Sequence, residues 1–248
     1  MRLPTSARWK RDPMMTSGII RGYRAKMNAS IRIYRKSVLL SLTRRRTLSD
    51  EIAYGGIDLQ LFSSDVYQAG NAIAARGEEY VPVYVDEAYR AGITHAANMI
   101  ELKGIEASVG MGPADWRTID ALKVRNLSAL KGISDEMSKQ IIHEVTEGVR
   151  AGEGMSVIRA RITDRVDKIG FTRADIMART EVMTAANDAS IQRYTQEGAT
   201  GWEWYTTQDD RLCPQCAPLH GRKYKFGEVS PPPLHARCRC VALPTFED

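Results

Sequence analysis

The sequence predicts an α+β protein, with a mainly helical N-terminal and central region followed by a small C-terminal β-hairpin subdomain. Two observations carry this prediction. Apolar residues recur at spacings of three and four along most of residues 21–197, which is the period of an amphipathic helix. After Gly198, short alternations of aromatic and β-branched residues replace that period, and they are typical of strands.

Length and composition allow one large domain or two small ones, since the chain has 248 residues and is 43% hydrophobic. No apolar run is long enough to span a bilayer, and the basic N-terminus lacks the apolar centre of a signal peptide. We therefore expect no membrane association and a protein made and kept in a reducing cytosol. Clustered cysteines in that compartment favour a metal site over disulfides.

Positive charge is concentrated at the N-terminus. Residues 1–50 hold 13 Lys or Arg and two acids, Asp12 and Asp50, so this part carries 13 − 2 = +11 and the rest 5 − 11 = −6. Such a segment is attracted to nucleic acid or to an acidic protein surface, and the alternative is a solvated terminus. The candidate partner-binding or DNA-binding residues are Arg21, Arg24, Lys26, Arg32, Arg35, Lys36, Arg44, Arg45 and Arg46.

The first 46 residues predict an arm followed by a basic amphipathic helix. Two prolines and the lack of a sustained period favour an extended arm over residues 1–20. From residue 21 to residue 46, apolar residues recur at helical spacing between the basic ones. This apolar stripe consists of Ile31, Tyr34, Val38 and Leu42.

The central region predicts two helices, over residues 58–76 and 83–102, because Pro82 does not fit a helix interior. Pro113 is well placed to open the next helix. The apolar face of the helix over 83–102 consists of Val85, Ala88, Tyr89, Ile93, Ala96 and Ile100.

Further helix starts are predicted at Ser134, Ser156 and Thr172, each from a capping side chain. The last helix, over residues 173–197, places Asn187 among apolar residues on one stripe. A buried amide must be hydrogen-bonded, so we expect Asn187 to fix a neighbouring loop or helix end. The alternative is a partly exposed amide at the edge of the stripe.

Strands are predicted at residues 201–207 and 221–226, on either side of a cysteine-rich loop. This β-rich subdomain, over residues 201–245, has little apolar core of its own. Small units of that kind usually need a cross-link such as a disulfide or a bound metal ion.

All four cysteines lie between residues 213 and 240. Cys213 and Cys216 have C-x-x-C spacing, and His235, Cys238 and Cys240 follow after a hairpin-sized insert. Two such clusters are typical of a structural zinc site, which needs four ligands. We expect one Zn²⁺ per chain, bound by Cys213, Cys216 and two of the other three. A disulfide and free thiols remain alternatives, and His220 is a weaker ligand candidate.

Catalytic readings of this segment find less support. The H-x-E motif of zinc deaminases, the H-E-x-x-H motif and a phosphate-binding P-loop are all missing from the sequence. We therefore expect no enzyme and no catalytic residues. A metal-dependent nuclease stays an alternative, and it would use His220, His235, Arg237 and Arg239 with Asp209 or Asp210.

An ordered series of short motifs resembles a known family. The series runs from "ARTE" at 178–181 through Asn187, Gly198, Trp204, "DDRLCPQC" at 209–216 and "LHGR" at 219–222 to "PPPLHARCRC" at 231–240 and Pro244. Residues 178–244 thus resemble the Mu F-like, or SPP1-type minor head protein, domain of tailed bacteriophages. Residues 132–170 are similar to the upstream part of that domain. Many members carry Asp where this chain has His220, which leaves open whether His220 has a role.

The resemblance, together with the charge and helix patterns, divides the chain into a basic arm and amphipathic helix at 1–50, a helical region at 51–131 and a Mu F-like head morphogenesis domain at 132–248. It implies a minor capsid protein that associates with the phage portal protein or the major capsid protein and supports head assembly and DNA packaging or delivery. Packaged double-stranded DNA is a further possible partner. The expected location is the phage head within the virion, and the host cytoplasm during assembly. The alternative function is a metal-dependent nuclease or DNA-binding protein of the phage.

Overall fold

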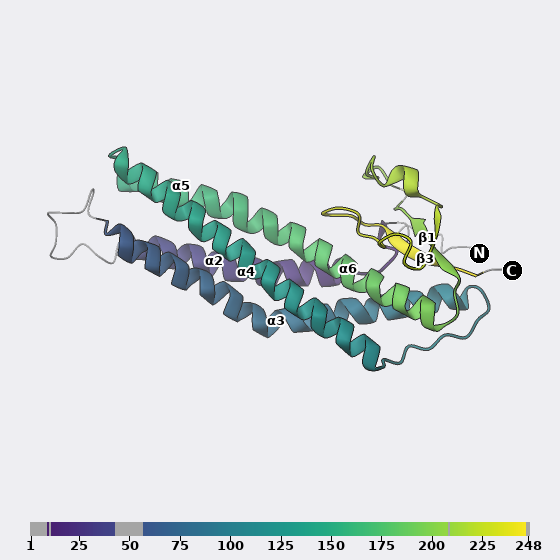
Figure 1. The fold of residues 1–248 in the computed structure, drawn as a ribbon. Coiled ribbons are helices and arrows are strands. Elements are labelled where there is room, and N and C mark those ends of the chain that lie inside the picture. The colour runs from purple at the N-terminus through teal and green to yellow at the C-terminus, as the bar shows by residue number, and fades with distance from the viewer. Residues whose placement is uncertain (1–8, 10, 43–56, 208, 247–248) are drawn as a thin grey trace. The chain divides into compact units, whose positions relative to one another are not determined.

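A computed structural model describes residues 9, 11–42, 57–207 and 209–246. The described residues are mainly helical up to residue 196 and form a small sheet after it (Figure 1). It divides into two compact units: unit 1 holds Met1–Tyr23, Pro82–Val124 and Ile176–Asp248, and unit 2 holds Arg24–Val81 and Arg125–Asp175. The three segments expected from the sequence stay a prediction. Among the described helices, none combines the length and apolar character that a membrane span requires.

Helix α2 spans Ser17–Ser41, and its predicted apolar stripe is confirmed, since Ile31, Tyr34, Val38 and Leu42 are all buried. The prediction of an extended arm is wrong where the structure describes it. Trp9 and Met14 are buried, and the Trp9 ring lies 5.1 Å from the ring of Tyr205.

The start of α2 explains this difference. The Asp12 carboxylate accepts hydrogen bonds from the backbone N–H groups of Thr16 and Ser17, at 3.0 and 2.9 Å. These N–H groups have no partner within the helix, so the acid stabilises the helix start.

Helix α3 runs without interruption over Leu59–Glu101 and contains Pro82. The prediction of two helices is therefore wrong. A proline inside a helix costs about 3 kcal/mol, but Tyr80, Val81 and Val85 around it are buried, and this packing offsets the lost backbone hydrogen bond. The predicted apolar face after Pro82 is confirmed, since its residues from Val85 to Ile100 are buried.

Helix α4 spans Pro113–Arg150 and opens at Pro113 as predicted. The helix start predicted at Ser134 is wrong, because α4 continues through it. The Ser134 hydroxyl is buried and donates a 2.7 Å hydrogen bond to the Gly70 carbonyl on α3, within unit 2. The Ser134 side chain, predicted to cap a helix, instead joins α4 to α3.

Helix α5 spans Met155–Arg165, a π-helical segment η2 follows at Val166–Phe171, and α6 spans Thr172–Gln196. The helix starts predicted at Ser156 and Thr172 are confirmed to within one residue, but neither side chain serves as the predicted cap. Gly154 precedes α5 without a side-chain cap, and Thr172 has helical backbone angles that continue the chain into α6. Val166 and Ile169 are buried, which favours a helical path where capping chemistry alone suggests a break.

The sheet has three antiparallel strands in the order β2-β1-β3, with β1 at Gly201–Tyr205, β2 at Lys223–Lys225 and β3 at Val241–Thr245. Both predicted strands are confirmed, and β3 is an addition. The sheet has little core of its own, as expected, because it shares one with helices of unit 1. That shared cluster includes Ala96, Met99 and Ile100 of α3, Met183 and Ala186 of α6, and Trp202, Trp204 and Leu243 of the sheet.

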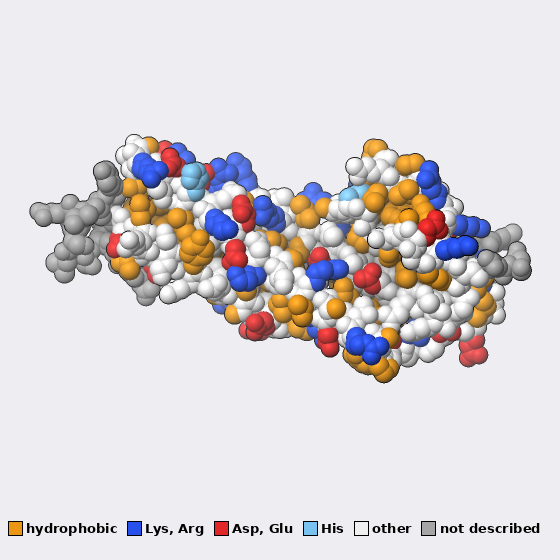
Figure 2. All heavy atoms as spheres, in the orientation of Figure 1, with side chains coloured by type: hydrophobic (Ala, Val, Ile, Leu, Met, Phe, Trp, Pro, Cys, Tyr) orange, Lys and Arg blue, Asp and Glu red, His pale blue; other side chains and the backbone are white. Residues whose placement is uncertain are grey.

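Ion pairs accompany the buried contacts of unit 2. Arg161 pairs with Glu144 at 2.8 Å and with Glu153 at 2.6 Å, and Arg165 also pairs with Glu144. Figure 2 shows basic and acidic side chains side by side over the end of α4 and over α5. Much of the charge on this face is therefore neutralised locally.

Candidate metal centre

Helix α6 fixes the segment that carries the last two cysteines. The Asn187 side chain is fully buried, and its nitrogen donates to the carbonyls of Met183 at 2.9 Å and Cys240 at 3.3 Å. Its oxygen accepts from the N–H of Ala242 at 3.0 Å. The expectation of a buried, bridging amide is confirmed, and the exposed alternative is wrong.

Tyr194 lies two turns further along the same face of α6. Its hydroxyl donates a 3.0 Å hydrogen bond to the Ala242 carbonyl, so both backbone groups of Ala242 are held by this helix. The sequence contained the signal for this role, since Asn187 and Tyr194 are seven residues apart on one apolar stripe.

Cys213 and Cys216 lie in a tight turn. The N–H groups of Cys216 and Ala217 donate to the Cys213 carbonyl, at 3.0 and 2.9 Å. Backbone N–H groups of Cys216 and Gln215 also face the Cys213 sulfur and lower the pKa of this thiol. The turn therefore favours a thiolate at Cys213, as C-x-x-C spacing leads one to expect.

The second group of donors comes from a turn just before β3. The N–H of Cys238 donates to the His235 carbonyl at 3.1 Å, and Arg237 adopts a left-handed φ of 63°. The N–H of Arg237 donates to the Thr180 hydroxyl on α6 at 3.4 Å. A third contact to α6 thus fixes this turn in addition to those of Asn187 and Tyr194.

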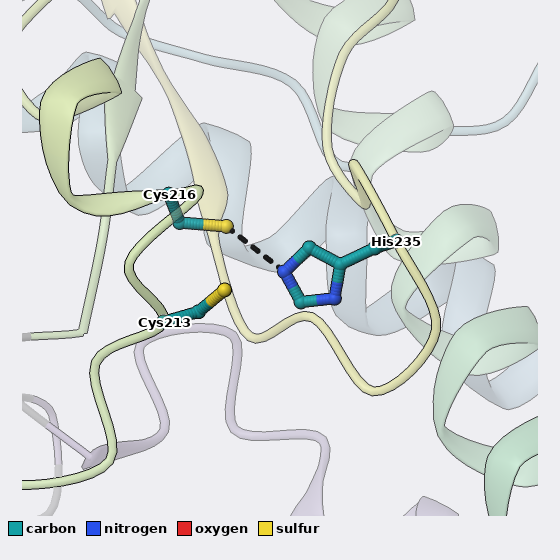
Figure 3. Close-up of side chains that lie close together, drawn as sticks. All are labelled: Cys213, Cys216 and His235. Carbon is teal, nitrogen blue, oxygen red and sulfur yellow. Dashed lines mark hydrogen bonds between the residues drawn. The ribbon is translucent and has the colours of Figure 1, made fainter.

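The two turns bring the predicted ligands together. Cys213, Cys216 and His235 form one group and Cys216, Cys238 and Cys240 a second, with donor atoms within 4.8 Å of one another in each. Figure 3 shows the first three side chains pointing toward one another, and Cys216 Sγ lies 3.1 Å from His235 Nε2. All five line a cavity of about 30 Å³, and none of the cysteines forms a disulfide.

His235 presents the right nitrogen to this cavity. Its Nδ1 donates a 2.8 Å hydrogen bond to the Ala236 carbonyl, which places the proton on Nδ1 and leaves the Nε2 lone pair facing the thiols. The same carbonyl raises the pKa of His235. A metal-binding histidine has this arrangement, in which the second ring nitrogen is fixed by a hydrogen bond.

Two of the sulfur atoms also lie at the separation that one metal ion requires. Sulfurs bound to a tetrahedral zinc at about 2.3 Å stand about 3.8 Å apart, and Cys216 Sγ lies 3.9 Å from Cys238 Sγ. Burial raises the pKa of Cys216 to about 12, while a hydrogen bond from Cys240 lowers the pKa of Cys238 to about 5. A divalent cation would stabilise the thiolates that burial disfavours.

One unsatisfied polar atom lies beside the donor cluster. The indole Nε1 of Trp204 is buried and has no hydrogen-bond partner among the residues that the structure describes. Cys238 and burial raise the pKa of the Cys240 thiol, and the nearby Trp204 N–H partly lowers it. The sulfur of Cys240 would be a suitable acceptor for this N–H, and the cysteines and the histidine that line the cavity fit a bound metal.

Residues 139–243 match the family described as Phage Mu protein F like protein. The resemblance predicted from the sequence is confirmed, and this Mu F-like segment ends within β3. It includes both cysteine turns and all of α6. No curated protein and no solved structure matches the chain.

Of the other residues considered for catalysis, Asp209 and Arg239 pair with each other, and Arg237 and Arg239 line the same cavity as the cysteines. Arg239 forms two hydrogen bonds to the Asp209 carboxylate, at 2.6 and 2.7 Å, and donates to the Arg211 carbonyl at 3.0 Å. The Arg239 guanidinium lowers the pKa of Asp209 to about 2. His220 Nδ1 accepts a hydrogen bond from the Thr206 N–H at 3.2 Å and belongs to neither donor group.

The Asp209–Arg239 pair links the two cysteine turns. Asp209 lies four residues before Cys213, and Arg239 lies between Cys238 and Cys240. Sequence reasoning considered both residues as nuclease candidates and missed this bridge. An acid and a base 30 residues apart give no local pattern that would identify them as partners.

The predicted basic residues of α2 differ in their surroundings. Arg24 pairs with Asp175 at 2.8 Å and Arg35 with Asp167 at 2.9 Å, both within unit 2. Arg21, Lys26, Arg32 and Lys36 are exposed on α2. Arg44, Arg45 and Arg46 lie outside the described residues.

Proposed function

We propose that this protein is a minor structural protein of a phage head, associated with the portal or the capsid interior and required for head assembly and DNA packaging or delivery. The observation that carries the proposal is the Mu F-like match over residues 139–243. The surplus of basic residues before residue 50 supports contact with an acidic partner, either packaged DNA or a protein of the head. In this role the protein has no catalytic residues.

We further propose that the donor cluster binds one structural zinc. Cys213, Cys216, His235 and Cys238 are the proposed ligands, and Cys240 lies beside them as the acceptor of the Trp204 N–H. When bound, the ion would supply a cross-link between the two turns. The chain itself supplies the rest: Arg239 and Asp209 hold the turns together, and α6 fixes the second turn and β3 through Asn187, Tyr194 and Thr180.

The zinc assignment is tested by elemental analysis of purified protein and of single variants. The wild type and Cys240→Ser are expected to retain about one zinc per chain, whereas Cys213→Ser and His235→Ala lose it. Chelation should lower the melting temperature of the wild type and leave that of Cys213→Ser unchanged. A zinc-free wild type, or a Cys213→Ser variant that melts like the wild type with zinc, contradicts the proposal.

The head function is tested in particles. We expect the chain to be found in purified heads, and we expect fewer infectious particles when its synthesis is blocked during infection. Free protein outside the heads, together with normal particle numbers, would contradict this function. Cleavage of DNA in a divalent metal, lost in His235→Ala, would instead support the nuclease alternative.

Buried residues in the basic segment limit which variants can test its binding role. Removing residues 1–50 would delete Met14, Met27, Ile31 and Tyr34 from the core, so such a variant reports on folding rather than binding. Replacing Arg21 and Lys26 by glutamine removes charge from exposed positions and leaves the core intact.

A further inference from the structure

One group of basic side chains on unit 2 lies around a defined hollow instead of being spread over the surface. The hollow is open to solvent and has a volume of about 400 Å³. We call it the α2–α5 groove. It is lined by Arg32, Arg35, Lys36, Leu39 and Leu40 of α2 and Arg159 of α5.

The cations of the α2–α5 groove are poorly neutralised. Among the described residues, Arg35 has one acidic partner, Asp167, while Arg32, Lys36 and Arg159 form no ion pair. This contrasts with Arg161 and Arg165 on the same helix as Arg159, which are paired with glutamates. The groove therefore keeps a local positive charge that favours an anionic ligand.

Part of this charge is already held in position. The guanidinium groups of Arg32 and Arg35 lie 5.8 and 6.0 Å from the centre of the Phe171 ring. Stacking on an aromatic ring limits the freedom of an arginine, so less entropy is lost when it binds a carboxylate.

The remaining wall is apolar and exposed. Leu40 is 55% exposed, and Leu39 lies beside it in the groove. Phosphate groups of DNA would pair with the cations but would not cover these leucines. A protein segment that carries both carboxylates and an apolar side chain fits the whole groove, as in the docking of an amphipathic helix.

We propose that the α2–α5 groove binds an acidic, leucine-containing segment of a partner protein. Carboxylates of the segment pair with Arg32, Lys36 and Arg159, and an apolar side chain packs on Leu39 and Leu40. The inference rests on the proposed head function only in that the partner would be a protein of the phage head. Binding to the groove can be tested independently of that function.

The test measures binding of purified full-length protein to three labelled peptides and to a short DNA duplex by fluorescence anisotropy. The first peptide carries leucines at helical spacing with glutamates on both sides. The second has glutamines in place of the glutamates, and the third has alanines in place of the leucines. We expect the first peptide to bind more tightly than the other two peptides and the duplex.

Variants of exposed side chains assign the binding to the groove. Lys36→Ala and Arg159→Ala are each expected to weaken binding of the first peptide about two- to fivefold, and Leu40→Gln about three- to tenfold. Lys139→Ala and Leu61→Gln change exposed residues of unit 2 that do not line the groove, and they should leave binding unchanged.

Three outcomes would overturn the proposal. The first is that the duplex binds as tightly as the first peptide and is unaffected by Leu40→Gln, which identifies a phosphate site. The second is that Lys139→Ala weakens peptide binding as much as Lys36→Ala. The third is that none of the peptides binds. If the wild type is nevertheless found in purified heads, only the groove assignment fails and the head function stands.

Discussion

Asn187 joins α6 to two backbone positions of the C-terminal segment with a single amide. Asn187→Ala would leave the Cys240 carbonyl and the Ala242 N–H without this partner in a buried setting, which costs about 1–3 kcal/mol for each group. We expect the free energy of unfolding, measured in urea, to fall by about 2–4 kcal/mol.

Asn98 provides the control, because its side chain is exposed on a helix of the same unit. Asn98→Ala should change the free energy of unfolding by less than about 0.5 kcal/mol. Equal losses in the two variants would show that the bridge from Asn187 contributes nothing specific.

The Asp209–Arg239 pair gives the protein an acid-sensitive contact. The pKa of Asp209 is lowered to about 2 in the folded state, below the value near 4 of an unfolded chain. The pair therefore contributes its full stabilisation above about pH 4 and loses it as the pH falls toward about 2. Asp209→Asn should cost about 1–2 kcal/mol at neutral pH and less at about pH 3.

The comparison uses Asp210→Asn, which removes an adjacent and exposed carboxylate. Both variants share any acid sensitivity of the cysteine cluster, so the difference between their unfolding free energies isolates Asp209. A difference that is the same at neutral pH and at about pH 3 would contradict the assignment.

At the scale of elements, the contact between α3 and α6 depends on a glycine. A Cβ atom at Gly92 would lie 2.1 Å from the Ala186 carbonyl oxygen, and the Ser190 hydroxyl donates to the carbonyls of both residues at 3.0 and 2.9 Å. We expect Gly92→Ala to push the helices apart and to lower the free energy of unfolding by about 1–3 kcal/mol.

Gly132 supplies the opposite case, since a Cβ atom there meets nothing within 4 Å on the surface of α4. Gly132→Ala should therefore raise stability by up to about 1 kcal/mol, because alanine favours the helix. The melting temperatures of Gly92→Ala and Gly132→Ala test both expectations. A lower melting temperature in Gly132→Ala would contradict the role assigned to open space at that position.

Helical periodicity identified the buried faces but misplaced several helix ends. The stripes of α2 and α3 follow from spacing alone, since apolar residues on one face must be buried wherever the helix packs. Local chemistry predicts breaks at Pro82 and Ser134, but both lie inside a helix because contacts distant in sequence outweigh their local preference.

The same contrast between local sequence pattern and tertiary packing applies to the candidate site. The C-x-x-C spacing and the later histidine and cysteines predicted which side chains converge, because ligand spacing is a local property of the sequence. Which helix fixes the second turn, and which acid pairs with Arg239, depends on tertiary packing. Only Asn187 was anticipated in that role, since an amide on an apolar stripe needs a partner.

At the scale of the whole molecule, the Mu F-like segment depends on residues outside its boundaries. Trp9, Met14, Ala96, Met99 and Ile100 belong to the cluster that packs against the sheet, yet none lies within residues 139–243. We expect a protein reduced to residues 139–243 to lack cooperative unfolding even with zinc, as measured by near-ultraviolet circular dichroism. A cooperative transition in this fragment would show that the metal alone can replace the missing helices.

Because segments of the two units alternate along the chain, the units become complete at different times during synthesis. Unit 2 has all of its residues once Asp175 has emerged, whereas unit 1 still lacks its last helix and every strand. The buried faces of Trp9, Met14 and the second half of α3 are then covered only after residues 176–246 have been made. Nascent chains are accordingly exposed to chaperones and proteases through Trp9 and Met14, which are made long before the residues that cover them.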